Sequence, residues 1–485
     1  MVNKDFGGVL SASYSECIEK ISSELAVEEN FDVIKKGLKA SGVELCFFYI
    51  DGFIKDGVMQ RIMQQILSEK NISDAHELER VLPYVELTVT DSYEEIITAV
   101  LSGQAALLSE SFYKKAIIID ARTYPARSTE EPDSDRVMQG SHDGFVETLI
   151  VNTALIRRRI RDPRLKMLHF NMGGSSKTDV AMCYVDGIAN EKYVKKLEEK
   201  LKNIAPKTLT LGFQSLAESL IRTGWLNPFP KIRTTERPDS ASAALLEGGI
   251  LVICDTSPQV MILPSSIFSY LEQADDYYYP PLTGTYLRLV RLSILLLSLI
   301  VTPLWYLSVK YSATLPEELL FLVPKDAGAL PILLQLILTE LAIDGLKIAS
   351  MNTPNMLSSS LSIIGALILG DFAVAVGWLC PDVILYMAFV AIANFAQQNH
   401  ELGYAIKFSR ILLLVLSAVM GIRGFVLGLI LIALLVATNT TVLGIGHYLY
   451  PLLPFSPRKM LKLLFRMPKS DVGMKNGKRG GTSPQ

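Results

Sequence analysis

The side chains best placed to do chemistry in this 485-residue chain are charged groups inside apolar segments. Glu340, Asp344 and Lys347 are spaced four and three apart, so on a helix they share one face. Asp371 and Arg423 interrupt two further apolar segments. Ionised groups are costly inside a bilayer and usually face a bundle interior or a water path. The pattern indicates ion passage; a position near the bilayer surface is the alternative for Asp371 and Arg423.

An ion path requires weak, repeated polar contacts, and several polar side chains of the apolar half extend the charged set. For the segment 331–350, an interfacial or re-entrant helix is the alternative to a helix that faces a polar lumen. The candidate pore-lining residues are Glu340, Asp344, Asn355, Ser358, Ser362 and Asp371.

Patterns typical of enzymes and metal sites are missing from the sequence. Segment 171–178 resembles a phosphate loop, but Asn171 and Ser176 stand where that motif needs glycine. His400-Glu401 lacks the second histidine of a zinc helix, and no Gly-x-Ser-x-Gly occurs. We therefore expect no catalytic residues, no cofactor and no metal ion.

A second charged constellation lies in the polar half of the chain. An acidic loop precedes a segment with four arginines, and bidentate arginine–carboxylate contacts would fix the loop onto that segment. A structural clamp is the favoured interpretation, and an anion site or separately solvated faces are the alternatives. The residues concerned are Glu130, Glu131, Asp133, Asp135, Arg157, Arg158, Arg159 and Arg161.

The distribution of charge divides the chain into two environments near Tyr286. Residues 1–285 carry 31 Lys/Arg and 40 Asp/Glu, whereas residues 286–450 carry eight of each. The acidic first part argues against nucleic acid as a partner, because phosphate binding needs a basic surface. The apolar second part predicts a helical domain in a lipid bilayer. The five cysteines show no CxxC spacing, and the four in the first part of the chain lie in apolar stretches, which favours buried thiols and a cytosolic head.

The apolar half contains four segments with the composition of membrane spans, 292–309, 357–379, 383–396 and 411–436. The last of these is interrupted at Arg423 and has two half-helices as its alternative. Four spans return the basic tail to the side of the head, as the usual excess of Lys and Arg in cytosolic segments favours. This topology places Lys407 and Arg410 on the outer side.

The polar half alternates strand-like and helical runs, which predicts an α/β head. Expected strands are 45–50, 104–108, 116–120, 178–185 and 249–255, and expected helices are 92–101, 143–161, 191–203, 216–223 and 240–247. The expected organisation is an N-terminal segment (1–29), two cytosolic αβ subdomains (30–140 and 141–285), a multi-span transmembrane helical domain (286–450) and a basic cytosolic tail (451–485).

Four long segments carry a resemblance to known proteins: ARSTEEPDSDRVMQGSHDGFVETLIVNTALIRRRIRDPRLK (126–166), SSKTDVAMCYVDGIAN (175–190), and the segments 235–264 and 352–374. In this order they resemble the GerA family of spore germination proteins, A-subunit type. The similarity covers nearly the whole chain.

The resemblance implies a protein of the spore inner membrane, or of the membrane of the cell that forms the spore, with a role in germination. It implies release of monovalent cations as the associated event, and a homo-oligomer for which a pentamer is the expected number. Germination receptor proteins and the dipicolinate channel are the implied protein partners, and no catalytic residues are implied.

Two hypotheses of function follow. The first is an oligomeric ion channel or channel subunit of spore germination. The second is a non-conducting scaffold or signalling subunit whose head docks germination receptors or the dipicolinate channel. A membrane-anchored enzyme is disfavoured because no nucleophile, base and metal constellation occurs in the sequence.

Overall fold

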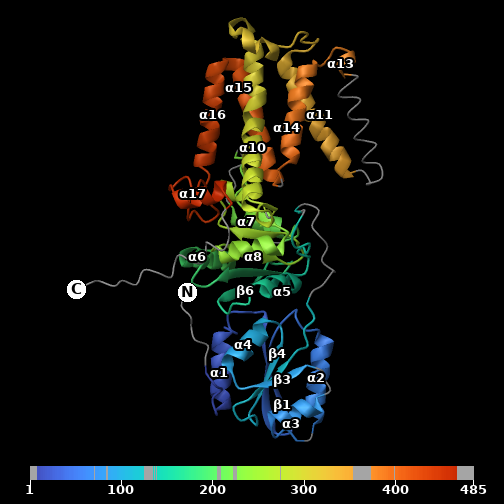
Figure 1. The fold of residues 1–485 in the computed structure, drawn as a ribbon, viewed down its shortest axis with the longest axis vertical. Coiled ribbons are helices and arrows are strands. Elements are labelled where there is room, and N and C mark those ends of the chain that lie inside the picture. The colour runs from blue at the N-terminus through green and yellow to red at the C-terminus, as the bar shows by residue number, and fades with distance from the viewer. Residues whose placement is uncertain are drawn as a thin grey trace, which may run out of the picture.

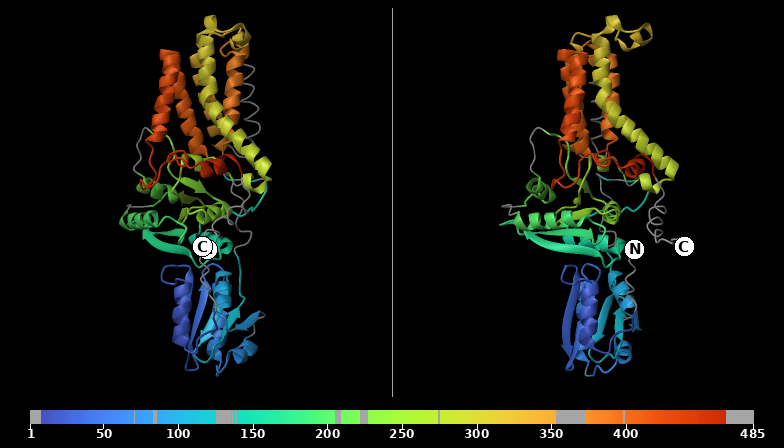
Figure 2. Two further views of the ribbon diagram at one scale, coloured as in Figure 1. Left: turned by 60° about the vertical axis from the view of Figure 1, so that its left-hand side comes forward. Right: turned by 90° about the vertical axis from the view of Figure 1, so that its left-hand side faces the viewer.

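The computed structural model describes residues 8–69, 71–82, 86–124, 135, 137, 139–204, 209–221, 227–273, 275–352, 373–397 and 399–466. The chain forms a column of three stacked parts (Figure 1). Two α/β units lie end to end, and a bundle of apolar helices stands on the second unit. The same stacking is visible from two further directions in Figure 2.

The first α/β unit is a five-stranded antiparallel sheet, with strand order β1-β2-β4-β5-β3, between two layers of helices. Its elements are α1 (Tyr14–Glu24), β1 (Val33–Ala40), β2 (Val43–Ile50), α2 (Asp56–Ser68), α3 (Ala75–Val81), β3 (Leu87–Thr90), α4 (Tyr93–Leu101), β4 (Ala105–Ser109) and β5 (Ala116–Ile119). Cys17, Ile18 and Ile21 of α1 lie in the core of this unit. The segment expected to precede the first subdomain, residues 1–29, therefore contributes a helix to it.

Strand β2 shows why this unit has three layers. Successive side chains of a strand point to opposite faces of the sheet. Leu45 and Phe47 pack with α2 and α3 on one face, whereas Cys46 and Phe48 pack with α1 and α4 on the other. A strand that is apolar at consecutive positions is therefore buried on both faces.

The second α/β unit repeats the topology of the first. Its strand order, β6-β7-β9-β10-β8, corresponds strand by strand to that of the first sheet, and the helices fall at equivalent places along the chain. Its elements are α5 (Leu149–Arg159), β6 (Leu165–Met172), β7 (Thr178–Val185), α6 (Glu191–Asn203), α7 (Phe213–Leu220), β8 (Arg233–Thr235), α8 (Pro238–Leu246), β9 (Ile250–Cys254) and β10 (Val260–Leu263). The head is thus a tandem pair of one arrangement.

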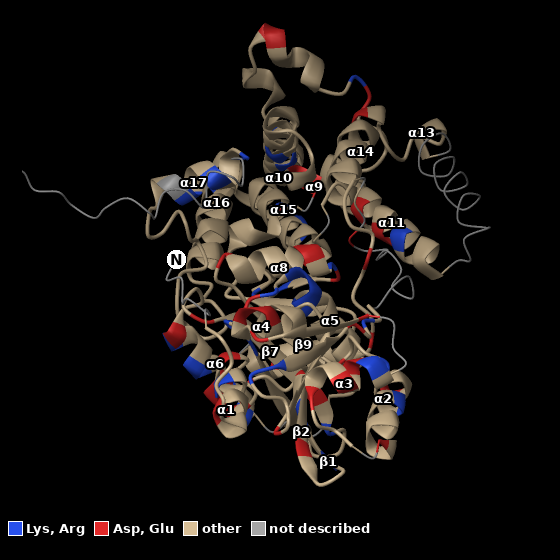
Figure 3. Ribbon diagram, turned by 60° about the horizontal axis from the view of Figure 1, so that its bottom comes forward, with Lys and Arg blue, Asp and Glu red and all other residues tan. Residues whose placement is uncertain are grey.

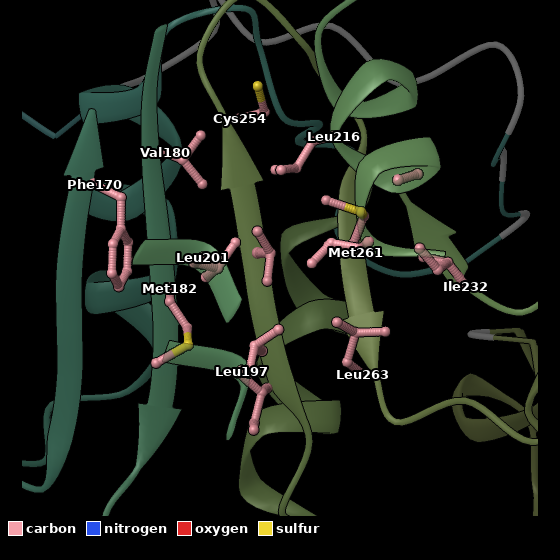
Figure 4. Close-up of a cluster of buried hydrophobic side chains, with 14 of the residues drawn as sticks. Phe170, Val180, Met182, Leu197, Leu201, Leu216, Ile232, Cys254, Met261 and Leu263 are labelled. Carbon is pink, nitrogen blue, oxygen red and sulfur yellow. The ribbon is translucent and has the colours of Figure 1, made fainter. Parts of the chain in front are cut away.

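Figure 4 shows the core on one face of the second sheet. Leu197 and Leu201 of α6 are four residues apart and lie over the sheet, where Met182 and Met261 contribute to the same cluster. Each large apolar side chain removed from water stabilises the fold by roughly 1.5–3 kcal/mol. The opposite face is covered by α5 and α8.

A buried ion pair joins the two units. Arg157 of α5 donates from Nε and Nη2 to the two carboxylate oxygens of Asp32, both at 2.9 Å, and from Nη1 to the carbonyl of Leu165. Arg157 is 0% exposed and Asp32 1% exposed. Next to them the Asn30 side chain accepts from the backbone N–H of Met167 at 2.8 Å. The chain segment before β1 is therefore fixed to the second sheet.

The helices expected in the head are largely present. The helix predicted over 191–203 has the bounds of α6. The helix predicted over 143–161 begins only at Leu149, because the preceding segment is extended and the N–H of Phe145 donates to the carbonyl of Glu236.

The helical domain follows a short connection formed by η1 (Ile267–Tyr270) and α9 (Asp275–Tyr278). Its described elements are α10 (Pro281–Lys310), η2 (Ser312–Thr314), η3 (Glu317–Leu322), α11 (Ile332–Asn352), α13 (Ala373–Ala375), α14 (Pro381–Phe395), α15 (His400–Met420), α16 (Ile422–Ala437) and α17 (Pro457–Leu464). Within the described residues, α10 and α15 are long and apolar enough to cross a membrane, and α14 and α16 are shorter apolar helices.

Helices α15 and α16 form an antiparallel hairpin, so the single span expected over 411–436 is wrong. The chain reverses at Gly421, whose φ of +65° is a backbone conformation that favours glycine. A Cβ at Gly424 would overlap the carbonyl oxygen of Leu416, so glycine allows the two helices to approach closely. Lys407 and Arg410 consequently lie within α15 and are buried, not on the outer side.

Candidate functional site

A cluster of four charged side chains lies inside the helical domain. Arg410 of α15 donates from Nη2 to both carboxylate oxygens of Glu340 on α11, at 2.7 and 2.8 Å. Its Nη1 donates to the carbonyl of Ser298 on α10 at 3.2 Å. Arg410 is 1% and Glu340 7% exposed. One buried guanidinium therefore joins three helices.

The rest of the cluster extends along the same two helices. Lys407, one turn before Arg410, pairs with Asp344 and lies 3.5 Å from a carboxylate oxygen of Glu340. Further along, the ammonium of Lys347 lies 5.1 Å from the centroid of the Tyr404 ring. The charged face predicted for α11 thus exists and contacts α15. We call Glu340, Asp344, Lys407 and Arg410 the charge cluster; with two acids and two bases it is formally neutral.

A cavity of about 240 Å³ borders the charge cluster. All four members of the cluster line it, together with Thr302 and mainly apolar side chains of α11 and α15. Figure 3 shows how sparse charged residues are on the helices around it, apart from the mixed charges on α11. The cavity combines space, polar atoms and apolar walls.

A second, polar cavity of about 250 Å³ lies between the head and the first turn of α15. Its lining contains four carboxylates and one arginine. They belong to Asp135, Glu236, Glu272, Glu401 and Arg233. Burial raises the pKa of Glu272 and also that of Asp135, although the hydroxyl of Thr235 donates to the latter. Acidic side chains therefore outnumber arginines in the lining of this cavity.

The joint between head and bundle is built around a carboxylate. Asp276 of α9 accepts from Arg288 Nε at 3.0 Å and from Arg291 Nη1 and Nη2 at 3.2 and 3.0 Å. Asp276 is 0% exposed. Arg291 also donates to the carbonyl of Leu271, and Arg288 to backbone carbonyls of α17. The first turns of α10 are therefore tied to the head and to the end of the chain.

Of the candidate pore-lining residues, the structure brings two together. Glu340 and Asp344 lie in the charge cluster, each paired with a basic residue of α15. The other four, Asn355, Ser358, Ser362 and Asp371, lie outside the described residues. Arg423 lies in the first turn of α16 and is exposed, at the end of the bundle far from the head.

The predicted clamp in the head would pair the acidic loop with the four arginines. Where the structure describes these residues, they contact other partners instead. Arg157 binds Asp32, and Arg159 donates to the carboxylate of Asp143 at 2.6 and 2.7 Å. The remaining described members make other contacts: Arg158 lies over the Tyr124 ring, Arg161 donates to Ser102, and Asp135 accepts from Thr235. Glu130, Glu131 and Asp133 lie outside the described residues. Arginines at adjacent positions of a helix point in different directions, so one loop does not collect all of them.

Sequence reasoning missed three of the important residues. Asp276 is not among the residues that the sequence analysis singles out, yet it is buried beneath two arginines. The expected topology puts Lys407 and Arg410 on the outer side of the membrane, whereas both are buried within α15. Lys407 and Arg410 are three positions apart and Glu340 and Asp344 are four apart, so each pair lies on one face of its helix. These two faces of opposite charge are the sequence signal that could have indicated the contact between α11 and α15.

The described part of the chain contains no group of three or more histidine, cysteine or acidic residues that could hold a metal ion. The five cysteines are buried and unpaired. Burial raises the pKa of the Cys183 thiol to about 12, as it does for Cys254, so both are protonated at neutral pH. Thiolate chemistry at these two positions is therefore suppressed.

The fold and the charge cluster define a class: a protein with a tandem α/β head and an apolar helical domain that holds paired charges. The family model described as "Bacillus/Clostridium GerA spore germination protein" matches residues 19–476. The chain belongs to this family of spore germination proteins.

Individual relatives match over most of the chain. Stage V sporulation protein AF of Bacillus subtilis (strain 168) is 35% identical over 456 residues, covering 93% of this chain and 92% of the relative. Spore germination protein KA of the same organism is 28% identical, covering 95% and 85%. An uncharacterised membrane protein of that organism, YfkQ, is 30% identical, covering 81% and 78%. Within the family, the sequence segments PARSTEEPDSDR (125–136) and GTYLR (284–288) indicate a resemblance to the first of these.

A solved structure also matches the head. It is the N-terminal domain of the A subunit of the Bacillus megaterium spore germinant receptor GerK3, with 25% identity and a TM-score of 0.41. The match covers 53% of this chain and 97% of that one.

Proposed function

We propose that this germination protein is an ion channel, or a subunit of one, that releases monovalent cations during germination. The observation that carries the proposal is the charge cluster inside the apolar helical domain. Ionised groups in such surroundings are costly and usually serve ion or proton movement. The adjoining cavity of about 240 Å³ supports the proposal, because it gives an ion space beside polar atoms.

The proposed channel spans the bilayer several times with its head in the cytosol. Helix α10 leads away from the head, and the hairpin of α15 and α16 leads away and back again (Figure 1). Arg288 and Arg291 at the foot of α10, and the basic residues after α16, then lie on the cytosolic side. This agrees with the excess of Lys and Arg in cytosolic segments of membrane proteins.

The polar cavity between head and bundle supports cations as the transported species. Its lining carries four carboxylates against one arginine. A cleft lined by one sign of charge raises the local concentration of ions of the opposite sign. In the proposed orientation this cavity lies at the cytosolic foot of α15, where potassium or sodium ions would enter.

We further propose that the protein acts as a homo-oligomer, with a pentamer as the expected number. Several large apolar side chains of α14 and α16 are exposed on the single chain, among them Leu385, Ile392, Ile430 and Leu434. Lipid tails and neighbouring subunits are the surroundings that such faces require. Germination receptor proteins and the dipicolinate channel are the proposed further partners.

One observation favours a second function, a non-conducting scaffold that docks other germination proteins. The acids of the charge cluster are paired within the chain, so a purely structural role also accounts for them. The exposed surface of the head would then supply the docking sites.

Ion flux from vesicles separates the two functions. The purified full chain would be reconstituted into liposomes loaded with potassium, and efflux would be compared with protein-free liposomes. A channel releases potassium when protein is present. The absence of protein-dependent efflux, together with a monomeric state in the same lipids, would overturn the channel proposal in favour of the scaffold.

A further inference from the structure

Helix α17, close to the C-terminal end of the chain, is a short amphipathic element at the foot of the bundle (Figure 1). At 100° per residue, Met460, Leu463 and Leu464 fall on one side, and all three are half-buried. Lys459 and Lys462 fall on the other side and are exposed. One side of α17 therefore packs against the protein, while the other presents ammonium groups to the surroundings.

Exposed apolar side chains accompany these lysines. Leu461 and Phe465 are each 46% exposed, and in the segment just before the helix Leu453 is 54% and Phe455 67% exposed. Segment 451–466 contains four basic residues and no acidic one. A short helix that combines apolar and basic side chains is typical of an element that lies in the plane of a membrane surface.

The foot of α10 holds α17 through its backbone. Arg288 Nη1 donates to the carbonyls of Lys462 and Leu463, at 2.9 and 3.3 Å. Just beyond the helix, Arg466 donates to the carbonyl of Tyr277 at 2.6 Å. A cation at the carbonyl end of a helix is favourable, because the helix dipole is negative there. Any force on α17 is therefore transmitted to Arg288, which also binds the buried carboxylate of the joint.

We infer that α17 binds the headgroups of anionic lipids on the cytosolic leaflet and thereby fixes the foot of α10. The basic surface without acids is complementary to phosphatidylglycerol or similar lipids, and the exposed apolar side chains enter the acyl region beside them. Each lysine close to an anionic membrane surface strengthens the attraction of the protein to that surface, and the contributions of separate lysines add up. The two lysine side chains together strengthen the association roughly thirtyfold on that basis. The inference uses the proposed orientation with the head in the cytosol, but it is independent of whether the bundle conducts ions.

Thermal unfolding of the purified full chain in neutral detergent tests the inference. Phosphatidylglycerol or phosphatidylcholine would be added to the chain and to the double variant Lys459→Gln/Lys462→Gln. The matched control is Lys36→Gln/Lys39→Gln, two exposed lysines at the same spacing in the first α/β unit, far from the bundle.

We expect phosphatidylglycerol to raise Tm more than phosphatidylcholine does, for the wild type and for the control. The α17 variant should lose at least half of that difference, and 0.5 M salt should reduce it for all proteins. Equal rises with the two lipids, or a full rise in the α17 variant, would overturn the inference. Inorganic phosphate should have no effect; a rise as large as with phosphatidylglycerol would assign a soluble-anion site instead and overturn it too.

Discussion

The buried pair of Glu340 and Arg410 gives the sharpest prediction for stability. Glu340→Gln keeps the shape of the side chain but removes the charge that two hydrogen bonds of 2.7 and 2.8 Å now satisfy. Arg410 then remains charged and almost fully buried, with the Ser298 carbonyl and a weaker amide acceptor as its partners.

The expected loss in the free energy of unfolding follows from the charge of Arg410, which stays buried without its carboxylate. Removing one partner of a buried ion pair costs about 3–5 kcal/mol, chiefly because the other charge stays buried without compensation. We expect the lower end, about 3 kcal/mol, since the substituted amide still accepts one hydrogen bond. Arg410→Gln should cost a similar amount, because among the described residues Lys407, at 3.5 Å, is the basic partner that Glu340 retains. The double variant should lose less than the sum, with a coupling energy of about 2 kcal/mol.

Unfolding of the full chain by sodium dodecyl sulfate in mixed micelles measures these differences. Glu318→Gln is the matched control, because Glu318 lies on an exposed turn of the same domain. The control should change the free energy of unfolding by less than about 0.5 kcal/mol. A loss below about 1 kcal/mol for Glu340→Gln, or strictly additive effects in the double variant, would refute the reasoning.

Three further predictions concern the joint, the head and the hairpin. Asp276→Asn leaves two buried arginines without a carboxylate, so it should lower stability by about 3 kcal/mol and speed trypsin cleavage between head and bundle; unchanged cleavage would contradict this. Burial alone would raise the pKa of Asp239, but hydrogen bonds from Arg237 and Tyr278 outweigh it and lower that pKa. Its contribution to stability is then complete above about pH 4 and is lost as the pH falls through the lowered pKa. The gap between wild type and Asp239→Asn in urea unfolding should therefore be constant from pH 7 to 5 and shrink below about pH 4; a constant gap at all pH values would refute it. Gly424→Val should force α15 and α16 apart and lower Tm by several degrees, whereas a neutral effect would show that the helices do not pack closely.

The sequence predicted the plan of the molecule from strong local signals. Consecutive apolar residues at 45–50 indicated a strand, and Glu191–Asn203 has the periodicity of an amphipathic helix. The change in charge near Tyr286 located the start of the apolar domain, because α10 begins at Pro281. These features depend on residues that are neighbours in the sequence.

Contacts between residues that are far apart in the sequence could not be predicted from such local patterns. The bond between Arg157 and Asp32 joins positions 125 residues apart, and the pair of Arg410 with Glu340 joins positions 70 apart. An arginine next to other arginines does not indicate which carboxylate it binds. The repeated strand order of the two sheets is also hidden, since it is a property of topology and not of matching residues.

Potassium efflux from proteoliposomes, measured for the wild type and two variants, tests the proposed channel most directly. With Glu340→Gln the charge cluster becomes net positive, and with Arg410→Gln it becomes net negative. If cations pass beside the cluster, the first change should lower the flux per folded protein and the second should raise it, each by roughly tenfold. No efflux from the wild type, or variants that shift the flux in the same direction, would contradict the account.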